Sequence, residues 1–494
     1  MKGPLNVIIM LTLFLLVYPD IQVAAKGLEE QMPIKQEAFA KKLLTESEYT
    51  IPVNGGVITA ALLPTVTAIP EVEFDEDWLK LKDIEKDING NYNLKFETTP
   101  NTYVSGRIAE ISVKANGTTE ILTISQEENI AAPDKSGMEA DAIQLVSGMT
   151  MGWNLGNTLE AIGGETYWGN PVTAEDMIVK IKGYGYNAVR LPCAWDQYLE
   201  NQTSYKIKDS WMSRVKDVVD YCINNDMYVI LNIHWDGGWL ENNCTPDKQA
   251  AVNIKQNALW EQIAVHFRDY DERLLFAGCN EPNAKNAEQA EVLRSYEQTF
   301  IDAVRRSGGR NAYRNLIVPS PETNIGLAKT IMKLPEDAIP NRMILEVHYY
   351  DPFNFCIMDK DESWGKMAYF WGKGYEQYAV GEYEGRFSTW GLEDHVLEQF
   401  KIIKQNFTDK GIPSILGEFG AARRRFDDPK IQLSHDQSRG YFYQIVTEQA
   451  KNNGVVPFIW EIGGVFDRRN NMRVTDPEVY NGMVRGAMAG KYPY

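Results

Sequence analysis

The strongest constraint on the fold is a run of eight short apolar segments that alternate with longer, helix-like segments from Ala142 onward. The apolar segments read MTMGWNLG, NAVRLP, MYVILNI, LLFAGC, NLIVPS, MILEVHY, PSILGEF and VPFIW. Helices are expected between them, over residues 211–225, 251–270, 287–307, 392–410 and 437–453. This alternation predicts an α/β fold, a (β/α)8 or TIM barrel over residues 142–494. A doubly wound sheet is the alternative, but WNLGNTLEA lacks the GxGxxG spacing of its phosphate loop.

Residues 46–128 follow a different pattern, in which apolar and polar residues alternate with period two. In GRIAEISVKANGTTEILTISQ the alternation continues on both sides of Asn116-Gly117, a pair that favours the positive-φ turn of a β-hairpin. This predicts a small all-β, immunoglobulin-like sandwich before the barrel. Residues 129–141 contain Pro, Gly and small polar residues and are predicted to form a linker.

The first 25 residues have the features of a signal peptide. Lys2 precedes an apolar run over residues 7–18, and residues 23–25 (Val-Ala-Ala) fit the small-residue cleavage rule. A run of this length is too short to span a bilayer, and a short N-terminal anchor helix is the alternative. No later segment has eighteen uninterrupted apolar residues, so we expect no membrane span in the mature protein.

Charge and cysteine content exclude several classes of protein. Lys and Arg total 50 and Asp and Glu total 68, so the formal net charge of −18 argues against binding to nucleic acid or to an anionic membrane. The five cysteines form no CxxC pair, so neither a zinc ribbon nor a redox pair is expected. We expect mostly buried free thiols, with one disulfide left open, at Cys193, Cys222, Cys244, Cys279 and Cys356.

Polar residues at the predicted strand ends define a candidate site, because the chemistry of a (β/α)8 barrel takes place at the C-terminal ends of its strands. Glu281 after the fourth strand and Glu418 after the seventh are expected to face each other across a cleft. Acetal hydrolysis uses such a pair, one carboxyl as proton donor and one at the oxocarbenium-like carbon, and a separation of about 5–5.5 Å makes the reaction retaining. The remaining candidates are Asn154, Arg190, His234, Trp235, Asn280, His348, Tyr350 and Trp460.

These residues fit supporting roles around the carboxylates. Arg190 and Tyr350 are expected to hold Glu418 ionised by charge and hydrogen bonding. Asn280 is suited to bind a sugar 2-hydroxyl. The two histidines are suited to orient the sugar or tune Glu281, and Trp460 to stack on a sugar ring. With five histidines in all and no early HxH pair, we predict no catalytic metal and no cofactor.

The motifs GWNLGNTLEA, NAVRLPCAW, VILNIHWDGG, CNEPN, VHYYDPF, LGEFG and FIW occur in this order and together resemble glycoside hydrolase family 5, the cellulase family A, over residues 142–494. The resemblance implies a retaining endo-β-1,4-glucanase that acts on β-glucan polysaccharide, with Glu281 as acid/base and Glu418 as nucleophile. Xyloglucanase, mixed-linkage glucanase and mannanase are the alternatives within the same chemistry. A non-catalytic glycan-binding barrel is the alternative from another class. Two departures concern the substrate, Trp235 where many relatives have His and Glu461 where many have Asp or Asn.

The hairpin, together with the upstream DEDWLKLK, resembles a BACON-type module. Such modules often precede secreted carbohydrate enzymes of gut and rumen bacteria, which implies a secreted bacterial protein, extracellular or periplasmic. Glycan binding and a spacer role are equally open for the module. We expect the protein to be a monomer.

Several other residues carry secondary expectations. Glu346 shares a strand face with His348 and is expected inside the barrel below the site. Asp236 and Glu461 are expected at the surface or in support of the site. The long aromatic segment 351–390 is expected to form a cleft wall or a self-packed minicore. Stacking on a ligand is expected of Trp168, Trp195, Trp235 and Trp239.

Overall fold

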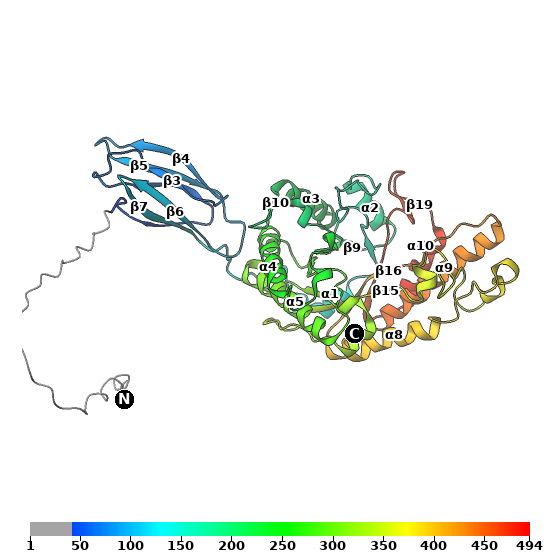
Figure 1. Cartoon of the computed structure of the whole chain (residues 1–494). Helices are drawn as coiled ribbons and strands as arrows, with labels where there is room; N and C mark the ends of the chain where they lie inside the picture. The colour runs from blue at the N-terminus through cyan, green and yellow to red at the C-terminus, as the bar shows by residue number, and fades with distance from the viewer. Residues whose placement is uncertain (1–41) are drawn as a thin grey trace, which may run out of the picture.

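The computed structural model describes residues 42–494, which form a β-sandwich and a barrel placed end to end (Figure 1). The predicted signal peptide, residues 1–25, lies outside the described residues. No helix within residues 42–494 is long and apolar enough to cross a membrane. The five cysteines are all free and buried, which confirms the expectation of buried thiols.

The sandwich has two sheets that enclose an apolar core. One contains β1 (Glu48–Ile51), β7 (Thr118–Gln126), β6 (Arg107–Ala115) and β3 (Glu71–Glu73), and the other contains β2 (Gly56–Ala61), β5 (Tyr92–Thr98) and β4 (Leu79–Lys86). The predicted hairpin is confirmed: Ala115 pairs with Thr118, and Asn116 and Gly117 have φ of 47° and 75°. Inward-facing residues of both sheets, such as Phe96 and Ile111, are fully buried.

All eight predicted apolar segments are strands of one closed parallel barrel, which confirms the fold prediction. In chain order these strands are β8 (Gly152–Asn154), β9 (Ala188–Leu191), β12 (Tyr228–Asn232), β13 (Leu274–Ala277), β14 (Leu316–Pro319), β15 (Met343–Tyr349), β16 (Ser414–Phe419) and β17 (Val455–Ile459). Two short hairpins lie in the loops, β10 (Leu199–Asn201) with β11 (Lys206–Ile207) and β18 (Phe466–Asp467) with β19 (Arg473–Val474).

The helices are α1 (Ala142–Ser147), α2 (Glu175–Gly183), α3 (Asp209–Asn224), α4 (Gln249–His266), α5 (Ala287–Arg306), α6 (Ile325–Thr330), α7 (Phe353–Cys356), α8 (Glu393–Asn406), α9 (Pro429–Asn452) and α10 (Pro477–Ala489). The predicted helix over 437–453 begins earlier than expected, at Pro429, because the Asp428 side chain caps the backbone N–H of Lys430 and proline is tolerated in the first turn.

The barrel interior changes from apolar to polar along the strands. A lower layer of side chains, including Ile230, Ile344 and Ile415, packs against α1 at the N-terminal ends of the strands. Farther along the same strands, Arg190 and Glu346 point into the interior and are fully buried. The polar layer therefore lies directly beneath the C-terminal mouth of the barrel.

The segment predicted as a linker, residues 129–141, is bonded to the floor of the barrel. The carbonyl of Met138 accepts a hydrogen bond from Arg342 Nη2 at 2.8 Å, and the carbonyl of Ala140 accepts one from Asn315 Nδ2 at 3.0 Å. Both donors are buried, so each depends on this segment for its partner.

The sandwich also contacts the helices on one side of the barrel. Ser105 Oγ donates to Glu261 Oε1 of α4 at 2.7 Å, and Arg306 of α5 pairs with the same oxygen at 2.5 Å. Tyr103 donates its hydroxyl hydrogen to the carbonyl of Ser204 at 3.0 Å. The sandwich therefore lies against α4 and α5 (Figure 1).

A truncated chain that begins at residue 142 should be less stable than one that begins at residue 129. The shorter chain leaves Arg342 and Asn315 without their buried acceptors, and each loss costs about 1–3 kcal/mol. Thermal unfolding of the two chains measures the difference. Equal melting temperatures would show that the floor segment contributes nothing to the stability of the barrel.

Candidate active site

Arg190 joins four strand ends of the barrel. Its Nη1 lies 3.1 Å from Glu418 Oε1 and donates to Asn154 Oδ1 at 3.1 Å. Its Nη2 lies 2.9 Å from Glu346 Oε1 and donates to Asn280 Oδ1 at 2.6 Å. The guanidinium is fully buried, and its planar set of donors suits this arrangement of several acceptors.

The two candidate carboxylates meet at His348. Glu281 Oε1 lies 2.7 Å from His348 Nδ1, and Glu418 Oε2 accepts from the Tyr350 hydroxyl at 3.1 Å. One carboxylate oxygen of Glu281 and one of Glu418 lie within 4.8 Å of each other. The side chain of Glu281 is 45% exposed, whereas that of Glu418 is 7% exposed, so Glu281 reaches farther toward solvent.

The protonation of this cluster follows from its charges. Burial alone would lower the pKa of His348, but Glu418, Glu281 and Glu346 raise it to about 10. Burial acts to raise the pKa of Glu281, yet the hydrogen bond and charge of His348 bring it below its ordinary value. At Glu418, burial raises the pKa against the opposing charges of His348 and Arg190. In the resting cluster, one proton therefore lies on the His348–Glu281 hydrogen bond, on the imidazole side.

His234 and Trp460 form a second pair in the site. Their rings are nearly parallel, at 4°, with centroids 5.7 Å apart. Burial, together with the charges of Arg190 and His348, holds the pKa of His234 well below its ordinary value. His234 is therefore a neutral imidazole at neutral pH, available for hydrogen bonding to an uncharged ligand.

The four tryptophans expected to stack on a ligand differ in their positions. Trp168 and Trp235 are each 43% exposed. Trp239 is partly buried, and its indole faces the Lys255 ammonium at 4.4 Å. For Trp195 the expectation is wrong: it is fully buried and donates Nε1–H to the carbonyl of Asn232 at 3.0 Å.

Two acids outside the predicted site turn out to be buried supports. Asp236 Oδ2 accepts from the backbone N–H groups of Trp195 at 2.8 Å and Asp196 at 2.7 Å, which ties the loops after β9 and β12 together. Glu461 follows Trp460 and lies 2.9 Å from Arg468 Nη2. No sequence motif predicts the contact of Arg468 with Glu461, because a loop brings the two residues together.

Gly417, which precedes Glu418 in β16, is in tight contact with the side chain of Glu346. An added Cβ at Gly417 would lie 2.0 Å from Glu346 Oε1, so only glycine leaves room for that carboxylate. Glu346 is where the sequence predicts it, inside the barrel, and its Oε1 also lies 3.1 Å from His348 Nε2.

Two hollows flank the carboxylate pair. One, of about 200 Å³, is lined by Glu281, Asn324, Phe353 and other residues. The other, of about 350 Å³, lies beside Trp460 and Tyr350, and we refer to it as the side pocket. Its other lining residues include Ala422, Arg423, Arg439, Ile462 and Asp476.

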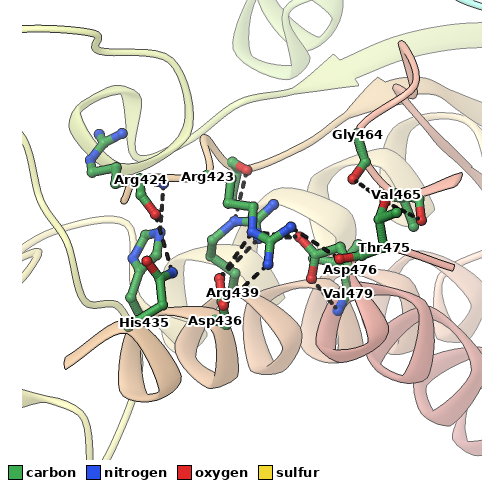
Figure 2. Close-up of polar contacts among 12 residues, drawn as sticks. Arg423, Arg424, His435, Asp436, Arg439, Gly464, Val465, Thr475, Asp476 and Val479 are labelled. Carbon is green, nitrogen blue, oxygen red and sulfur yellow. Dashed lines mark hydrogen bonds and ion pairs between the residues drawn. The ribbon is translucent and has the colours of Figure 1, made fainter. Parts of the chain in front are cut away.

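Arg423, Arg439 and Asp476 line the side pocket and are called its floor, and Figure 2 shows their ion pairs. Arg439 Nη1 lies 2.5 Å from Asp476 Oδ2, and Arg423 Nε lies 3.3 Å from Asp436 Oδ1. The two arginines of this floor are thus paired, Arg439 with Asp476 and Arg423 with Asp436, which is not itself a lining residue, so the floor presents donors and acceptors whose charges have partners. Arg439 Nε also donates to the carbonyl of Ala421 at 3.1 Å, which connects the floor to the loop after Glu418.

The aromatic segment 351–390 contains both a buried, self-packed part and exposed rings, the two arrangements that the sequence left open. Trp371 is fully buried and packs edge-to-face on Phe442 of α9, with ring centroids 5.1 Å apart. Phe353 and Trp364 are 43% and 68% exposed, and Phe353 lines the hollow next to Glu281.

One group of possible metal ligands occurs among residues 42–494, formed by Glu281, His348 and Glu418. The Nδ1 of His348 and the Oε1 of Glu281 are only 2.7 Å apart. Two ligand atoms of one tetrahedral Zn²⁺, each about 2 Å from the metal, lie more than about 3 Å apart. The spacing fits a shared proton, and we do not assign a metal site here.

Comparison with known proteins gives two family matches. Residues 153–465 match the model of the cellulase family, glycosyl hydrolase family 5. Residues 67–127 match the BACON model, which is described as an N-terminal binding domain.

The relatives include endoglucanases and xyloglucan-specific glucanases. A xyloglucan-specific endo-β-1,4-glucanase of Bacteroides ovatus is 35% identical over 73% of this chain and 75% of its own length. Endoglucanase A of Paenibacillus barcinonensis is 33% identical over 70% of this chain and 90% of its own length. Among solved structures, the Bacteroides ovatus GH5 xyloglucanase covers 90% of this chain and 98% of its own, with 30% identity and a TM-score of 0.69. A xyloglucan-specific glucanase from a ruminal metagenomic library covers 72% of this chain and 98% of its own, with 37% identity and a TM-score of 0.66.

Gly417→Ala should lower the melting temperature, because the added methyl group displaces the buried Glu346 carboxylate from Arg190. Overpacking of this kind costs about 1–3 kcal/mol. Gly420→Ala is the matched control, since its Cβ would meet no atom closer than 3.2 Å. If thermal unfolding shows no larger loss for Gly417→Ala than for Gly420→Ala, the close contact is not a constraint on this strand.

Proposed function

The chain belongs to the cellulase family, glycosyl hydrolase family 5, and on that premise we propose that it is a secreted endo-β-1,4-glucanase that hydrolyses internal β-1,4-glucosidic bonds with retention of configuration. The observation that carries the proposal is the pair Glu281 and Glu418, with oxygens within 4.8 Å of each other at the mouth of the barrel. Retaining glycosidases place their carboxyl groups about 5–5.5 Å apart, whereas inverting enzymes leave room for a water molecule between them.

In the first step Glu418 is the nucleophile. Its oxygen forms a bond to the anomeric carbon as the bond from that carbon to the glycosidic oxygen breaks. Glu281 gives its proton to the departing oxygen, and this proton is supplied along the 2.7 Å bond from His348. Moving the proton from imidazole to carboxylate leaves the net charge of the cluster unchanged, so the acid form of Glu281 is reached without a new buried charge.

In the second step water cleaves the glycosyl–Glu418 ester. Glu281, now ionised, takes a proton from the attacking water, and the new bond forms on the face from which the first leaving group departed. Arg190 and Tyr350 donate hydrogen bonds to Glu418 and stabilise it as a leaving carboxylate.

The other predicted residues act on the sugar or support the residues that do. Asn280 accepts from Arg190 through Oδ1, which fixes the orientation of its amide for a bond to the 2-hydroxyl. Trp460, backed by the neutral His234, offers its ring as a stacking surface. Asn154 holds the Arg190 side chain, and Trp235 adds an exposed ring at the rim.

Glu418→Ala should lose nearly all activity, and azide should restore turnover of an aryl β-cellobioside and yield the α-glycosyl azide. Azide takes the place of the missing nucleophile on the α face. Glu281→Ala, the matched variant, should give the β-glycosyl azide because its glycosyl-enzyme still forms. Nuclear magnetic resonance identifies the anomers, and exchanged products would reverse the two roles. Full activity without Glu418 would refute the mechanism.

Xyloglucan is the second candidate substrate, and the side pocket is the observation that favours it. The pocket of about 350 Å³ opens beside Trp460 and Tyr350, to the side of the reacting carbon. Its paired arginines and aspartates suit a neutral, hydroxyl-rich branch. The Bacteroides ovatus relative is named as specific for xyloglucan, which supports the same choice.

Ile462→Trp should discriminate between branched and linear substrates. The larger side chain narrows the side pocket, so kcat/KM on xyloglucan should fall about tenfold, which corresponds to about 1.4 kcal/mol. Activity on unbranched β-glucan should change by less than about twofold. Ile254→Trp, at an exposed position on α4, is the control for the substitution itself. Equal losses on both substrates would exclude the pocket as a branch site.

For the N-terminal domain we favour the spacer role over glycan binding. No aromatic side chain within residues 42–128 is exposed. Trp78 is buried, and the Arg107 guanidinium covers its ring at 4.6 Å. The aromatic rings of the described sandwich are thus at most partly exposed, which disfavours a flat sugar-stacking surface there. We propose that the mature chain, after removal of residues 1–25, acts outside the cytoplasm of a bacterium as a monomer.

A further inference from the structure

We propose that Glu241 is a positioning residue of the reaction, which holds the Asn280–Glu281 turn in place and, by its own charge, extends the pH range in which Glu281 donates a proton. The inference rests on the proposed function, since it concerns the acid step of that reaction. Neither the motifs of the sequence nor the family resemblance indicated this residue.

The contacts of Glu241 carry the first half of the inference. The residue begins the 3-10 turn η3 (Glu241–Asn243) in the loop after β12 and is 4% exposed. Its Oε1 accepts the backbone N–H of Glu281 at 3.0 Å, and its own carbonyl accepts the backbone N–H of Asn283 at 2.9 Å. Pro282, between them, has no N–H. Glu241 therefore binds both backbone donors of residues 281–283, which fixes the direction of the Glu281 side chain.

The electrostatic surroundings carry the second half. Within residues 42–494, no Lys, Arg or His side chain forms an ion pair with Glu241. Burial, followed by the charges of Glu281 and Glu418, raises the pKa of Glu241 to about 7, although the bonds from Glu281 N–H and the Asn280 side chain act to lower it. The nearby titratable groups are Glu297 on α5, Cys244 after η3, Cys279 after β13 and Asp236 in the loop after β12, and burial is the first cause that raises the pKa of each. The pKa of Glu241, at about 7, places its own change of charge near neutrality, directly beside the backbone of Glu281.

The direction of the effect follows from these charges. As pH rises through neutrality, Glu241 becomes an anion bonded to the backbone of Glu281. A negative charge at this position disfavours ionisation of Glu281 and so keeps the proton of the Glu281–His348 pair in the site. The Glu281–His348 pair therefore loses this proton at a higher pH than it would without the charge on Glu241.

The test is Glu241→Gln in the full chain, because the amide oxygen still accepts the Glu281 N–H while the charge is removed. With unsubstituted cello-oligosaccharides, the alkaline limb of kcat/KM should move down by about one pH unit. With a dinitrophenyl β-cellobioside, whose leaving group needs no proton, the alkaline limb should not move. Glu297→Gln is the matched control, a buried carboxyl on α5 without a bond to the turn, and its profile should follow the wild type.

The inference is overturned if folded Glu241→Gln keeps the wild-type alkaline limb, or if Glu297→Gln moves that limb equally. If Glu241→Gln does not fold, the carboxyl titration of wild-type Glu241 by carbon-13 nuclear magnetic resonance decides: a midpoint above about pH 6 supports the inference and a lower one overturns it. Failure of the proposed function is distinct, because the wild type would then show no turnover of either substrate.

Discussion

The buried guanidinium of Arg190 is the interaction on which the site depends. A charge at this depth is costly unless countercharges and hydrogen-bond acceptors surround it. Glu346 and Glu418 supply the countercharges, and Asn154 and Asn280 supply further acceptors. Conversely, the carboxylates beside Arg190 lie so close together that they need both this cation and the proton near His348. The same contacts therefore determine both the positions of these side chains and their protonation states.

The loops that complete the site are held by buried polar contacts rather than by long regular elements. Glu461 and Arg468 tie the loop after β17, and Asp236 ties the loops after β9 and β12. Arg439 with Asp476 connects α9 and α10 to the loop that follows Glu418. Groups fixed in this way need little rearrangement when charge develops on a bound sugar, which is the main electrostatic contribution to catalysis.

The N-terminal and C-terminal ends of the barrel strands have different roles. The segment before α1 closes the N-terminal ends of the strands through Arg342 and Asn315, and the sandwich packs on α4 and α5. The two candidate carboxylates, Glu281 and Glu418, lie at the opposite, C-terminal ends, where loops vary without disturbing the barrel. The candidate site and the contacts with the N-terminal domain are therefore at different ends of the barrel.

The sequence alone was sufficient for the barrel, the sandwich hairpin and the assembly of a network containing Arg190, Glu281 and Glu418. This is because strand periodicity and the parallel arrangement determine which residues share one edge of the barrel. The burial of Trp195, the bond from Arg468 to Glu461 and the bonds of Glu241 to the turn at Glu281 were decided only by the tertiary structure. Those contacts join different loops, and the path of a loop depends on packing against its neighbours, which no periodicity in the sequence records.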